Sequence, residues 1–395
     1  MTKLYCLEAL IKGSYTSAVS KRRSLYQYLY GLQGWALPYK KWSPEKLYQS
    51  AYHKNCENVI GFTSIPVGLV GPIQINSRQR FLPIATTEGA LIASMNRGCK
   101  LLQGGVNVHV EDVGMTRAPL IGCESIEAAR EFREWLLTNT NVIKVLFEET
   151  SQHSTLQSVT AHQCGRDIHL KFRAITDDAM GMNMVTKGCT AVLIHIKKYF
   201  PKIKIISLSG NYCTDKKVAA TNWITGRGKL VIAEAKLQPM DIQKILGCTG
   251  KDLVEINIKK NLVGSAFAGA FGGFNAQASN VVAGLYAAMG QDLGQIGTSS
   301  TCIVQIEWNS DDSLSASVTM PNVEVGVVGG GTDLPSQSEA LKIAQVESSI
   351  DLASLVGGGV LAGELSLLGS LRRGDLMDAH LKLNRKMSKE LTIYN

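Results

Sequence analysis

A run of small residues spaced four apart, between positions 261 and 289, constrains the fold more than any other feature of this sequence. Its members are Gly264, Ala268, Gly272, Ala276, Asn280, Gly284 and Ala288. Because residues four apart lie on one helix face, the spacing predicts a single helix, about 40 to 45 Å long at 1.5 Å per residue. Glycine costs about 1 kcal/mol relative to alanine inside a helix. Such a helix must therefore be buried and held by tertiary packing.

The length of 395 residues is too great for one small core and favours two domains. We expect an α+β fold with a large, mainly helical domain at residues 53–117 and 209–387, built round the long helix. A small domain at residues 118–208 is inserted into it. Residues 1–52 form a short helical N-terminal region, and residues 388–395 form a C-terminal tail.

The predicted small domain alternates helices and strands. Amphipathic patterns predict helices at 125–138 and 178–199, and apolar runs predict strands at 142–147, 167–175 and 202–208. Strands and two helices over so short a stretch indicate a compact ferredoxin-like, split βαβ sandwich.

Other elements are predicted outside this unit. We expect helices at 17–30 and 86–102, the latter capped by Thr86 or Thr87. A strand at 313–325 should precede a helix at 336–346.

Two glycine-rich runs invite a dinucleotide interpretation. Residues 357–362 fit G-x-G-x-x-A formally, but no strand precedes them, which favours close packing of a helix instead. Residues 326–332 are better placed, between a strand and a helix, where N–H groups can bind a pyrophosphate. By spacing alone this second signal is weak.

Composition narrows the classes of function. The formal charge of +8 suits a polyanionic ligand such as a nucleotide or an acyl-CoA, with nucleic acid as the alternative. No aromatic-rich RNA motif or zinc-finger spacing supports that alternative. The nine cysteines form no C-x-x-C pair, which favours a reducing compartment and argues against a metal site. No run of 18 apolar residues predicts a membrane span, and no secretory signal is recognisable.

The segment Ser209-Gly-Asn-Tyr-Cys-Thr-Asp-Lys-Lys217 carries the strongest chemical signal. It places Asp215, Lys216 and Lys217 side by side just after an apolar, strand-like run. An acid beside two bases at a strand end suits an anionic substrate and a developing oxyanion. Such charges on a loop are often only solvated, but the hydrogen-bonding neighbours in this segment favour a site.

Several isolated polar residues also stand where packing does not require them. Glu88 falls at a helix start, where it could simply complement the helix dipole. Lys260 precedes the small-residue run and could be a surface lysine. Asn280 interrupts that run, either to satisfy neighbouring backbone or to bind a ligand. Asp292 follows a helix end, which acids do not favour. His380 stands alone in a helical segment at 375–386.

Together these segments resemble the 3-hydroxy-3-methylglutaryl-CoA reductase family, in its eukaryotic-type class I catalytic domain. The matching stretches are Glu57-Asn-Val-Ile-Gly-Phe62, Ile65-Pro-Val-Gly-Leu-Val-Gly-Pro72, Ala85-Thr-Thr-Glu-Gly89, Gly114-Met-Thr-Arg117, Asp178-Ala-Met-Gly-Met-Asn-Met184, Ser209 to Lys217, Asn261-Leu-Val-Gly-Ser265, Gly290-Gln-Asp292, Gly329-Gly-Gly-Thr332 and Ala362-Gly-Glu-Leu-Ser-Leu367. They extend from about residue 50 to the end of the chain. The family's membrane-spanning N-terminal region has no counterpart in this sequence.

The resemblance implies reduction of 3-hydroxy-3-methylglutaryl-CoA to mevalonate and CoA by two NADPH, in the mevalonate route to isoprenoids and sterols. Lys216 matches the cation that stabilises the oxyanion. Asp292 would lie beside Lys216 and Glu88. His380 would protonate the departing thiolate, and Glu88 would protonate the alkoxide of the second step.

The resemblance also implies which residues bind. Those that match the hydroxymethylglutaryl site are Arg117, Ser209, Asp215, Lys217, Lys260 and Asn280, and those on the helix that meets CoA phosphates are Ser94, Asn96, Arg97 and Lys100. Those that match the NADPH region are Ser151, Asp178, Met180, Met182, Gly329, Gly330, Gly331 and Thr332. No metal is implied. The family's active site is shared between subunits, so we expect a dimer or a tetramer. We expect the cytosol, or the cytosolic face of the endoplasmic reticulum if an anchor is missing.

Three positions depart from the family pattern. Gln152 replaces an arginine that would bind the cofactor's 2′-phosphate, so the preference for NADPH over NADH stays open. His153 would replace that arginine only in part. Gln277 replaces a substrate-side histidine. Lys386 stands where many relatives have a phosphorylatable serine, so inhibitory phosphorylation should be absent. An inactive relative that serves as a CoA-binding or interaction module is the alternative; the four catalytic candidates, all retained, argue against it.

Overall fold

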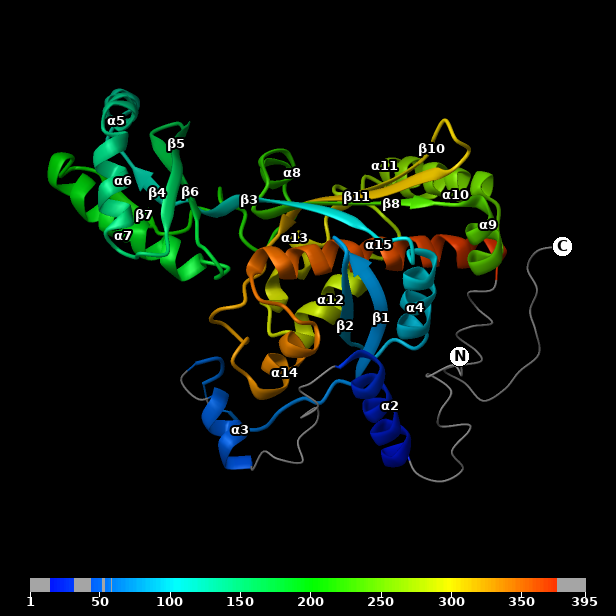
Figure 1. Ribbon diagram of the computed structural model, residues 1–395. Coiled ribbons are helices and arrows are strands. Elements are labelled where there is room, and N and C mark those ends of the chain that lie inside the picture. Colours follow the sequence, from blue (N-terminus) through cyan, green and yellow to red (C-terminus); the bar gives the residue numbers. More distant parts are fainter. Residues whose placement is uncertain (1–14, 32–43, 52–53, 58, 375–395) are drawn as a thin grey trace.

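The computed structural model describes residues 15–31, 44–51, 54–57 and 59–374. It is a mixed α/β protein with a nine-stranded sheet in the order β7-β4-β6-β3-β8-β11-β10-β9, in which β5 pairs with β6, and a separate hairpin sheet of β1 and β2. Figure 1 shows a smaller lobe, on the left, joined through β3 to a larger one.

The strands of the described chain are β1 (Val67–Ile75), β2 (Arg78–Ala85), β3 (Asn107–Arg117), β4 (Leu120–Gly122), β5 (Thr155–Cys164), β6 (Asp167–Ile175), β7 (Lys204–Ser207), β8 (Gly228–Leu237), β9 (Gly273–Phe274), β10 (Cys302–Trp308) and β11 (Leu314–Val323). The α-helices are α2 (Tyr15–Tyr30), α3 (Pro44–Ala51), α4 (Leu91–Leu101), α5 (Ile126–Thr138), α6 (Thr140–Glu148), α7 (Met182–Tyr199), α8 (Ala220–Thr225), α9 (Pro239–Asp241), α10 (Gly250–Ile256), α11 (Ser265–Phe267), α12 (Ala278–Ala288), α13 (Ile296–Ser299), α14 (Pro335–Ile343) and α15 (Ser349–Arg373). Short π-helical or 3-10 turns are η2 (Ile242–Leu246), η3 (Asn257–Gly264) and η4 (Leu293–Gln295).

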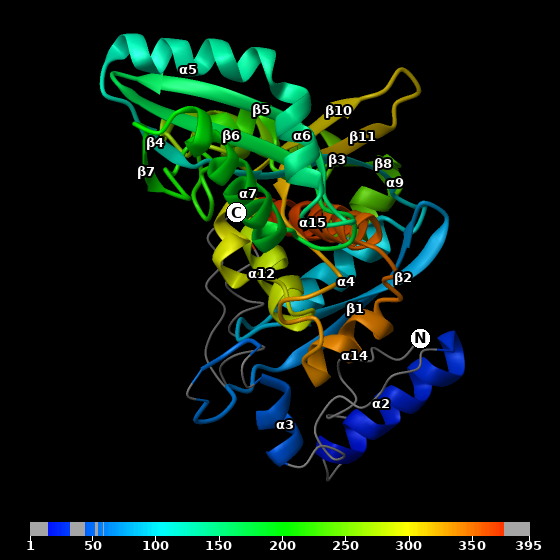
Figure 2. The ribbon, with the colours of Figure 1, turned by 90° about the vertical axis from the view of Figure 1, so that its left-hand side faces the viewer.

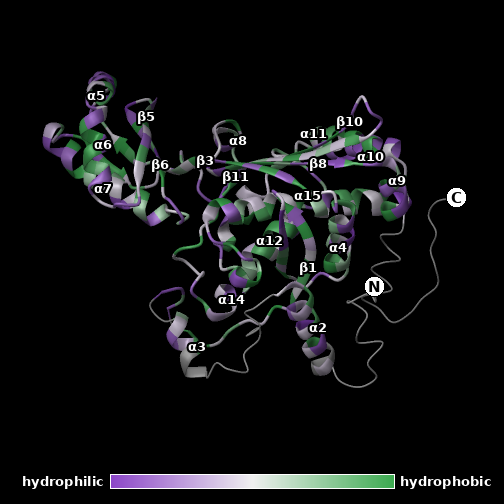
Figure 3. Cartoon of the chain, in the orientation of Figure 1, coloured by the Kyte–Doolittle hydropathy of each residue, from purple (hydrophilic) through white to green (hydrophobic). Residues whose placement is uncertain are grey.

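Two hydrophobic cores lie on either side of the middle of β3. Val108, near the start of this strand, belongs to the larger core, and Met115, near its end, belongs to the smaller one. The smaller core is built from the inner faces of α5, α6 and α7 on the strands β4, β5 and β6. These helices carry mixed hydrophobic and hydrophilic colour in Figure 3, as expected where one face meets a core and the other meets water.

Helix α15 is the central helix of the larger core. It packs against α4, α12 and the strands β3, β8 and β11, and Figures 1 and 2 show it between the hairpin sheet and the long strands. It is long and apolar enough to cross a membrane, yet 94% of its most apolar window is buried, as in a core helix of a folded domain. A Cβ at Gly358 would lie 2.7 Å from Ile75 Cδ1. A Cβ at Gly98 of α4 would lie only 1.9 Å from Ala362 O, so this stretch also packs closely on a helix. The prediction that residues 357–362 serve close packing of a helix is therefore confirmed.

The single helix predicted at 261–289 is wrong. The chain is helical to Phe267, then turns through Gly269 and Gly272, whose φ angles of 69° and 70° no right-handed helix permits, and α12 begins only at Ala278. The small residues thus mark a tight turn between two helical pieces. The role of central helix belongs to α15, and the strands β3, β8, β10 and β11 also form much of the larger lobe.

Two local predictions need the same correction. Residues 142–147, predicted as a strand, lie in α6, because burying Ile143 and Phe147 four residues apart puts both on one helix face against the core. The helix predicted from Thr86 begins at Leu91, after Ala90 at a φ of 71°, and has no side-chain cap. By contrast, α5 begins after Ser125, whose hydroxyl accepts from Ala128 N–H as a helix cap should.

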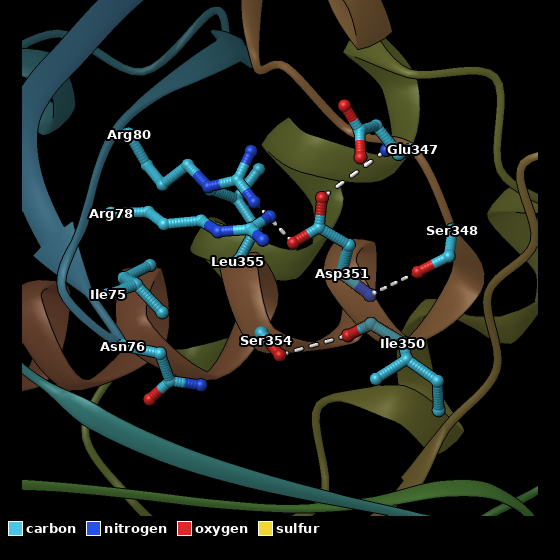
Figure 4. Close-up of a pocket in the computed structure, with 10 residues that line it drawn as sticks. All are labelled: Ile75, Asn76, Arg78, Arg80, Glu347, Ser348, Ile350, Asp351, Ser354 and Leu355. Atoms are coloured by element: carbon cyan, nitrogen blue, oxygen red, sulfur yellow. Dashed lines mark hydrogen bonds and ion pairs between the residues drawn. The ribbon is translucent and has the colours of Figure 1, made fainter.

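A buried ion pair ties the hairpin sheet to the start of α15. Arg80 is 6% exposed and binds Asp351, and it also donates to the carbonyls of Ala344 and Gln345. Figure 4 shows Arg78 and Arg80 reaching from β2 into the same cavity, of about 430 Å³. Arg78 is exposed and makes no ion pair with the described residues.

We predict that Arg80→Ala lowers the free energy of unfolding by about 2 to 4 kcal/mol, because it leaves the carboxylate of Asp351 without its cation. Urea unfolding followed by circular dichroism measures it. Arg78→Ala is the matched control from the same strand and should change the free energy by less than about 0.5 kcal/mol. Equal effects of the two substitutions would contradict this account.

Candidate active site

The loop at residues 209–217 is held in a conformation that residues with side chains seldom adopt. Asn211, Thr214 and Lys216 have φ angles of 61°, 52° and 59°. Each such residue costs of order 1 kcal/mol and persists only where surrounding contacts fix it. The loop is anchored by Gly210 N–H, which donates to Ala118 O at 2.6 Å.

Lys216 and Asp292 form an ion pair at the surface of the larger lobe. Lys216 Nζ lies 3.1 Å from Asp292 Oδ2, and the two side chains are 50% and 31% exposed. Asp292 begins the short turn η4, where its Oδ1 accepts from Gly294 N–H at 2.9 Å. This explains an acid after a helix: α12 has already ended at Ala288, and Asp292 caps the next turn. The pair offers a fixed ammonium that solvent and a ligand can reach.

Asp215, the neighbour of Lys216, points the other way, into the protein. Its Oδ1 accepts from Arg227 Nη2 at 3.0 Å and from Gln295 Nε2 at 2.8 Å, and Arg117 Nη1 lies 3.9 Å from its Oδ2. Burial would raise the pKa of Asp215, but the hydrogen bond from Gln295 and the charges of Arg227, Arg117 and Lys216 outweigh it and lower the pKa. Asp215 is thus a carboxylate that anchors the loop.

Beneath the loop lies a buried ion pair that the sequence analysis missed. Arg227 is 0% exposed; its Nη1 lies 2.6 Å from Glu324 Oε2, and its Nε donates to Thr116 Oγ1 at 3.0 Å. Burial opposes the charge of Arg227, but Glu324 and Asp215 raise its pKa. Burial raises the pKa of Glu324 to about 7 despite the charge of Arg227.

A sequence signal for this pair exists. Arg227 stands between two glycines at the start of β8, and Glu324 interrupts the apolar end of β11. A lone ionisable residue in an apolar strand must be paired when buried. Finding two such residues far apart in the sequence is a reason to expect that they meet.

Glu88 is not joined to the Lys216–Asp292 pair. It lies in the loop between β2 and α4, where its N–H donates to Thr86 Oγ1 at 3.0 Å. Across the described residues its carboxylate makes no hydrogen bond or ion pair. Its predicted catalytic role therefore stays a prediction. His380 and Lys386 lie outside the described residues.

A second cluster surrounds Glu364 on α15. This buried carboxylate accepts from Ala276 N–H at 2.6 Å and Gln277 N–H at 2.7 Å, just before α12. Gln277 Nε2 donates to Gly363 O at 2.8 Å, and Asn280 Nδ2 lies 3.5 Å from Gln277 Oε1. Gln277 and Asn280 are thus brought together by the glutamate. Lys260 is exposed on η3, close enough for its charge to favour ionised Glu364.

The residues predicted to meet CoA phosphates are engaged mostly in packing. Arg97 Nε donates to Ser366 Oγ at 2.9 Å, and Ser94 Oγ lies 3.0 Å from the same oxygen, so α4 is joined to α15. Asn96 accepts from Gly71 N–H at 3.0 Å. Lys100 is exposed. The phosphate role therefore stays a prediction for all four.

The segments predicted to hold the cofactor do lie together. Asp178 O accepts from Val327 N–H at 2.8 Å, and Ala179 pairs with Val328, so the start of α7 adjoins the glycine loop at 329–332. Asp178 Oδ1 accepts from Ser349 N–H at 2.7 Å. The N–H groups of Gly329, Gly330 and Gly331 donate to no acceptor in the described chain.

Of the remaining predicted residues, Ser209, Lys217 and Ser151 make short-range contacts. Ser209 Oγ lies 3.7 Å from Cys213 Sγ, and Lys217 Nζ donates to Asp215 O at 3.2 Å. Ser151 Oγ accepts from His153 N–H at 3.2 Å. Met180 and Met182 pack on the smaller core, and Met182 Sδ lies 2.8 Å from Arg227 Nη2. Thr332 Oγ1 donates to Gly329 O at 2.7 Å. No group of three potential metal ligands occurs within the described residues.

Comparisons with known proteins bear on the whole arrangement. A family model described as hydroxymethylglutaryl-coenzyme A reductase matches residues 18–385. The chain belongs to this family. It is 46% identical over 344 residues to 3-hydroxy-3-methylglutaryl-coenzyme A reductase 1 of Dictyostelium discoideum, covering 84% of this chain and 62% of that protein. It is 43% identical over 402 residues to reductase 2 of Gossypium hirsutum, covering 98% and 63%. The chain thus spans less than two thirds of the length of these relatives.

A solved structure shares the fold. The class II 3-hydroxy-3-methylglutaryl-CoA reductase of Streptococcus pneumoniae, bound to NADPH in open conformations, matches with a TM-score of 0.68 and 17% identity, covering 91% of this chain and 98% of that one. The reductases of higher identity named above are eukaryotic, in agreement with the eukaryotic type expected from the motifs.

We predict that Glu364 makes the protein less stable as pH rises. Burial raises its pKa from 4.5 to about 7, against the lowering effect of its two backbone donors. Its contribution is full below pH 4.5 and is lost as pH rises through about 7. Between pH 5 and 7 the unfolding free energy of the native chain should fall more steeply than that of Glu364→Gln, by at most about 1.4 kcal/mol per pH unit. Urea unfolding at several pH values measures both; parallel curves would exclude this cause.

Proposed function

We propose that this chain carries the catalytic unit of a hydroxymethylglutaryl-CoA reductase, which converts 3-hydroxy-3-methylglutaryl-CoA to mevalonate and CoA with two NADPH. The observation that carries the proposal is the Lys216–Asp292 ion pair, 3.1 Å across and half open to solvent. A reductase of a thioester needs a fixed cation where the oxyanion develops. Lys216 supplies it, and the ion pair with Asp292 holds its ammonium in place.

The two other predicted catalytic groups are proposed for proton transfer. Glu88 is exposed on a loop, and its carboxylate makes no hydrogen bond with the described residues, so its carboxyl is available to the alkoxide of the second step. His380 is proposed as the acid that protonates the CoA thiolate, because an imidazole titrates near neutrality. Apo geometry alone does not remove a candidate acid that reaches its partner only when substrate is bound.

The cofactor is proposed to bind between the smaller core and the glycine loop. The N–H groups of Gly329, Gly330 and Gly331, which donate to no acceptor among the described residues, fit the oxygens of a pyrophosphate. Asp178, Met180 and Met182 would line the nicotinamide end. When bound, NADPH supplies the hydride; the chain's own residues bind and orient it and stabilise the charge that results.

Residues 118–208 are proposed as the inserted cofactor domain. The strand order β7-β4-β6-β5 is wholly antiparallel, and helices follow β4 and β6 in the chain. That order supports a split βαβ sandwich. The substrate domain would then comprise residues 53–117 and 209–387.

Self-association is proposed through the segment at 257–272. Val263, Phe267 and Phe271 on this segment are 59%, 96% and 47% exposed. Exposed apolar groups so close together favour a protein interface. Lys260 is exposed on the same segment, so a partner subunit would bring its lysine to the other copy's substrate. The cytosol, or the cytosolic face of the endoplasmic reticulum, is proposed as the compartment.

We predict that Lys216→Ala lowers kcat for hydroxymethylglutaryl-CoA by about a hundredfold or more, the usual effect of removing one oxyanion-stabilising group. Oxidation of NADPH and of NADH, followed by absorbance, measures it. Lys204→Ala, an exposed lysine on β7, is the control and should leave kcat unchanged. An unmodified chain that oxidises neither cofactor would favour the alternative of an inactive, CoA-binding relative.

We predict that Gln152→Arg lowers the KM for NADPH severalfold and leaves the KM for NADH unchanged. Gln152 is exposed and makes no hydrogen bond in the described chain, while His153 Nδ1 lies 2.9 Å from Asp177 Oδ2, so this ring nitrogen is already engaged. An added guanidinium would contact the 2′-phosphate. An unchanged KM for NADPH would show that residue 152 lies away from the phosphate.

A further inference from the structure

A second cavity, of about 600 Å³, lies in the smaller lobe. It is lined by Arg133, Ala161, His162, Gln163, Cys164, His169 and Tyr212. These residues come from α5, from the edge strand β5, from β6 and from the loop at 209–217. The lining contains a guanidinium, two imidazoles, a phenol and an amide, and no carboxylate. Its donors and its size suit a small anionic ligand.

Most of the charged groups around the cavity are positive. Arg133 Nη1 donates to Gln163 Oε1 at 3.2 Å in an exposed hydrogen bond. Lys171, buried on the neighbouring strand β6, donates to Thr221 Oγ1 at 3.0 Å. Burial lowers the pKa of His162, and the charges of Lys171, His169 and Arg133 lower it further. Asp167, opposite Cys164 in the strand register, is the nearby acid on β6. An anion here would meet a positive field.

The two imidazoles differ in their hydrogen bonds: His162 Nε2 lies 2.9 Å from Thr160 Oγ1, and its Nδ1 lies 3.2 Å from the Tyr212 hydroxyl, so both of its nitrogens have partners. His162 and His169 are direct cross-strand partners of β5 and β6, so they share one face of the sheet. The ring of His169 makes no hydrogen bond with the described residues, and its Nδ1 is buried without a partner, facing Gly210. A buried polar atom without a partner costs about 1 to 3 kcal/mol. Since Nδ1 faces Gly210, a ligand in the cavity that His169 lines would be met by the other ring nitrogen, Nε2.

Tyr212 joins this cavity to the loop of the candidate active site. Its ring stacks on His162 with centroids 4.3 Å apart, and its hydroxyl lies 3.2 Å from His162 Nδ1. Asp215 and Lys216 follow three and four residues later in a loop with left-handed residues at 211, 214 and 216. Since such residues hold their conformation only through surrounding contacts, the ring stack is one of the contacts that place Lys216.

We propose that this cavity binds a phosphate-bearing small molecule, and that its occupancy strengthens the contact between His162 and Tyr212 and so fixes the loop that carries Lys216. The consequence for turnover rests on the proposed function. An anion favours charged His162, whose Nδ1–H would donate to the phenol oxygen in a charge-assisted hydrogen bond. The cavity is larger than an inorganic phosphate needs, so a phosphomonoester should bind more tightly than phosphate.

Calorimetry tests the binding, with inorganic phosphate and glycerol 3-phosphate at matched ionic strength. We expect both ligands to bind the unmodified chain, and glycerol 3-phosphate to bind more tightly. Arg133→Gln and His169→Phe should each weaken binding about tenfold or more, the usual effect of losing a charged or buried donor. Arg130→Gln is the matched control: this exposed arginine on α5 pairs with Glu134 and should leave binding unchanged. Binding that survives both cavity substitutions would place the anion elsewhere and overturn the proposal.

Hydrogen exchange at residues 209–217 tests the coupling without any need for turnover. Glycerol 3-phosphate should slow exchange in this loop severalfold. The variant Tyr212→Phe keeps the ring but not the hydroxyl; its affinity for the ligand should stay within about twofold of the unmodified chain's, while most of the protection from exchange should be lost. The same exchange rates with and without ligand would refute the coupling. Absence of phosphate binding in a chain that turns over refutes the cavity site alone. Binding that depends on Arg133, in a chain that reduces no thioester, refutes the proposed function alone.

Discussion

The buried guanidinium of Arg227 is the interaction on which the candidate active site depends. It lies 3.0 Å from Asp215 in the loop at 209–217 and 2.6 Å from Glu324 at the end of β11, and it also binds Thr116 on β3. A buried cation must be paired to be tolerated, so it draws carboxylates from distant parts of the chain to one point. The ion pair between Arg227 and Asp215 therefore anchors the loop from which Lys216 points outward. The geometry of the candidate site at the surface therefore depends on a charge in the interior.

A similar device opens α12. Glu364 reaches from the central helix to the two N–H groups at Ala276 and Gln277, which a helix start leaves without partners. The carboxylate thereby fixes where α12 begins, and with it the places of Gln277 and Asn280. Both sides of the candidate substrate site are thus positioned by a buried acid whose own pKa is raised to about 7. Burial is unfavourable for the ionised acid, and the hydrogen bonds that the acid makes to the backbone offset this cost.

The comparison of sequence and structure shows where local patterns mislead. The small residues at 261–289 predict one helix by spacing, yet Gly269 and Gly272 adopt left-handed angles and break it. Spacing reports which residues could share a face; it does not report whether the backbone stays helical between them. In α6, tertiary contacts override the strand preference of Val142, Ile143 and Val145, because a helix buries Ile143 and Phe147 together. The helix α5 was predictable because its periodicity and its cap at Ser125 agree.

The sequence by itself determined the family, the loop that carries Asp215, Lys216 and Lys217, and the presence of Asp292, since these depend on the order of residues along the chain. Only the tertiary structure decided that Lys216 Nζ meets Asp292 Oδ2, that Arg227 and Glu324 lie beneath them, and that α15 is the central helix. It also left Glu88 without a contact to the pair. The physical reason is that burial is a property of the whole fold. A charged group must be paired only when other segments of the chain bury it.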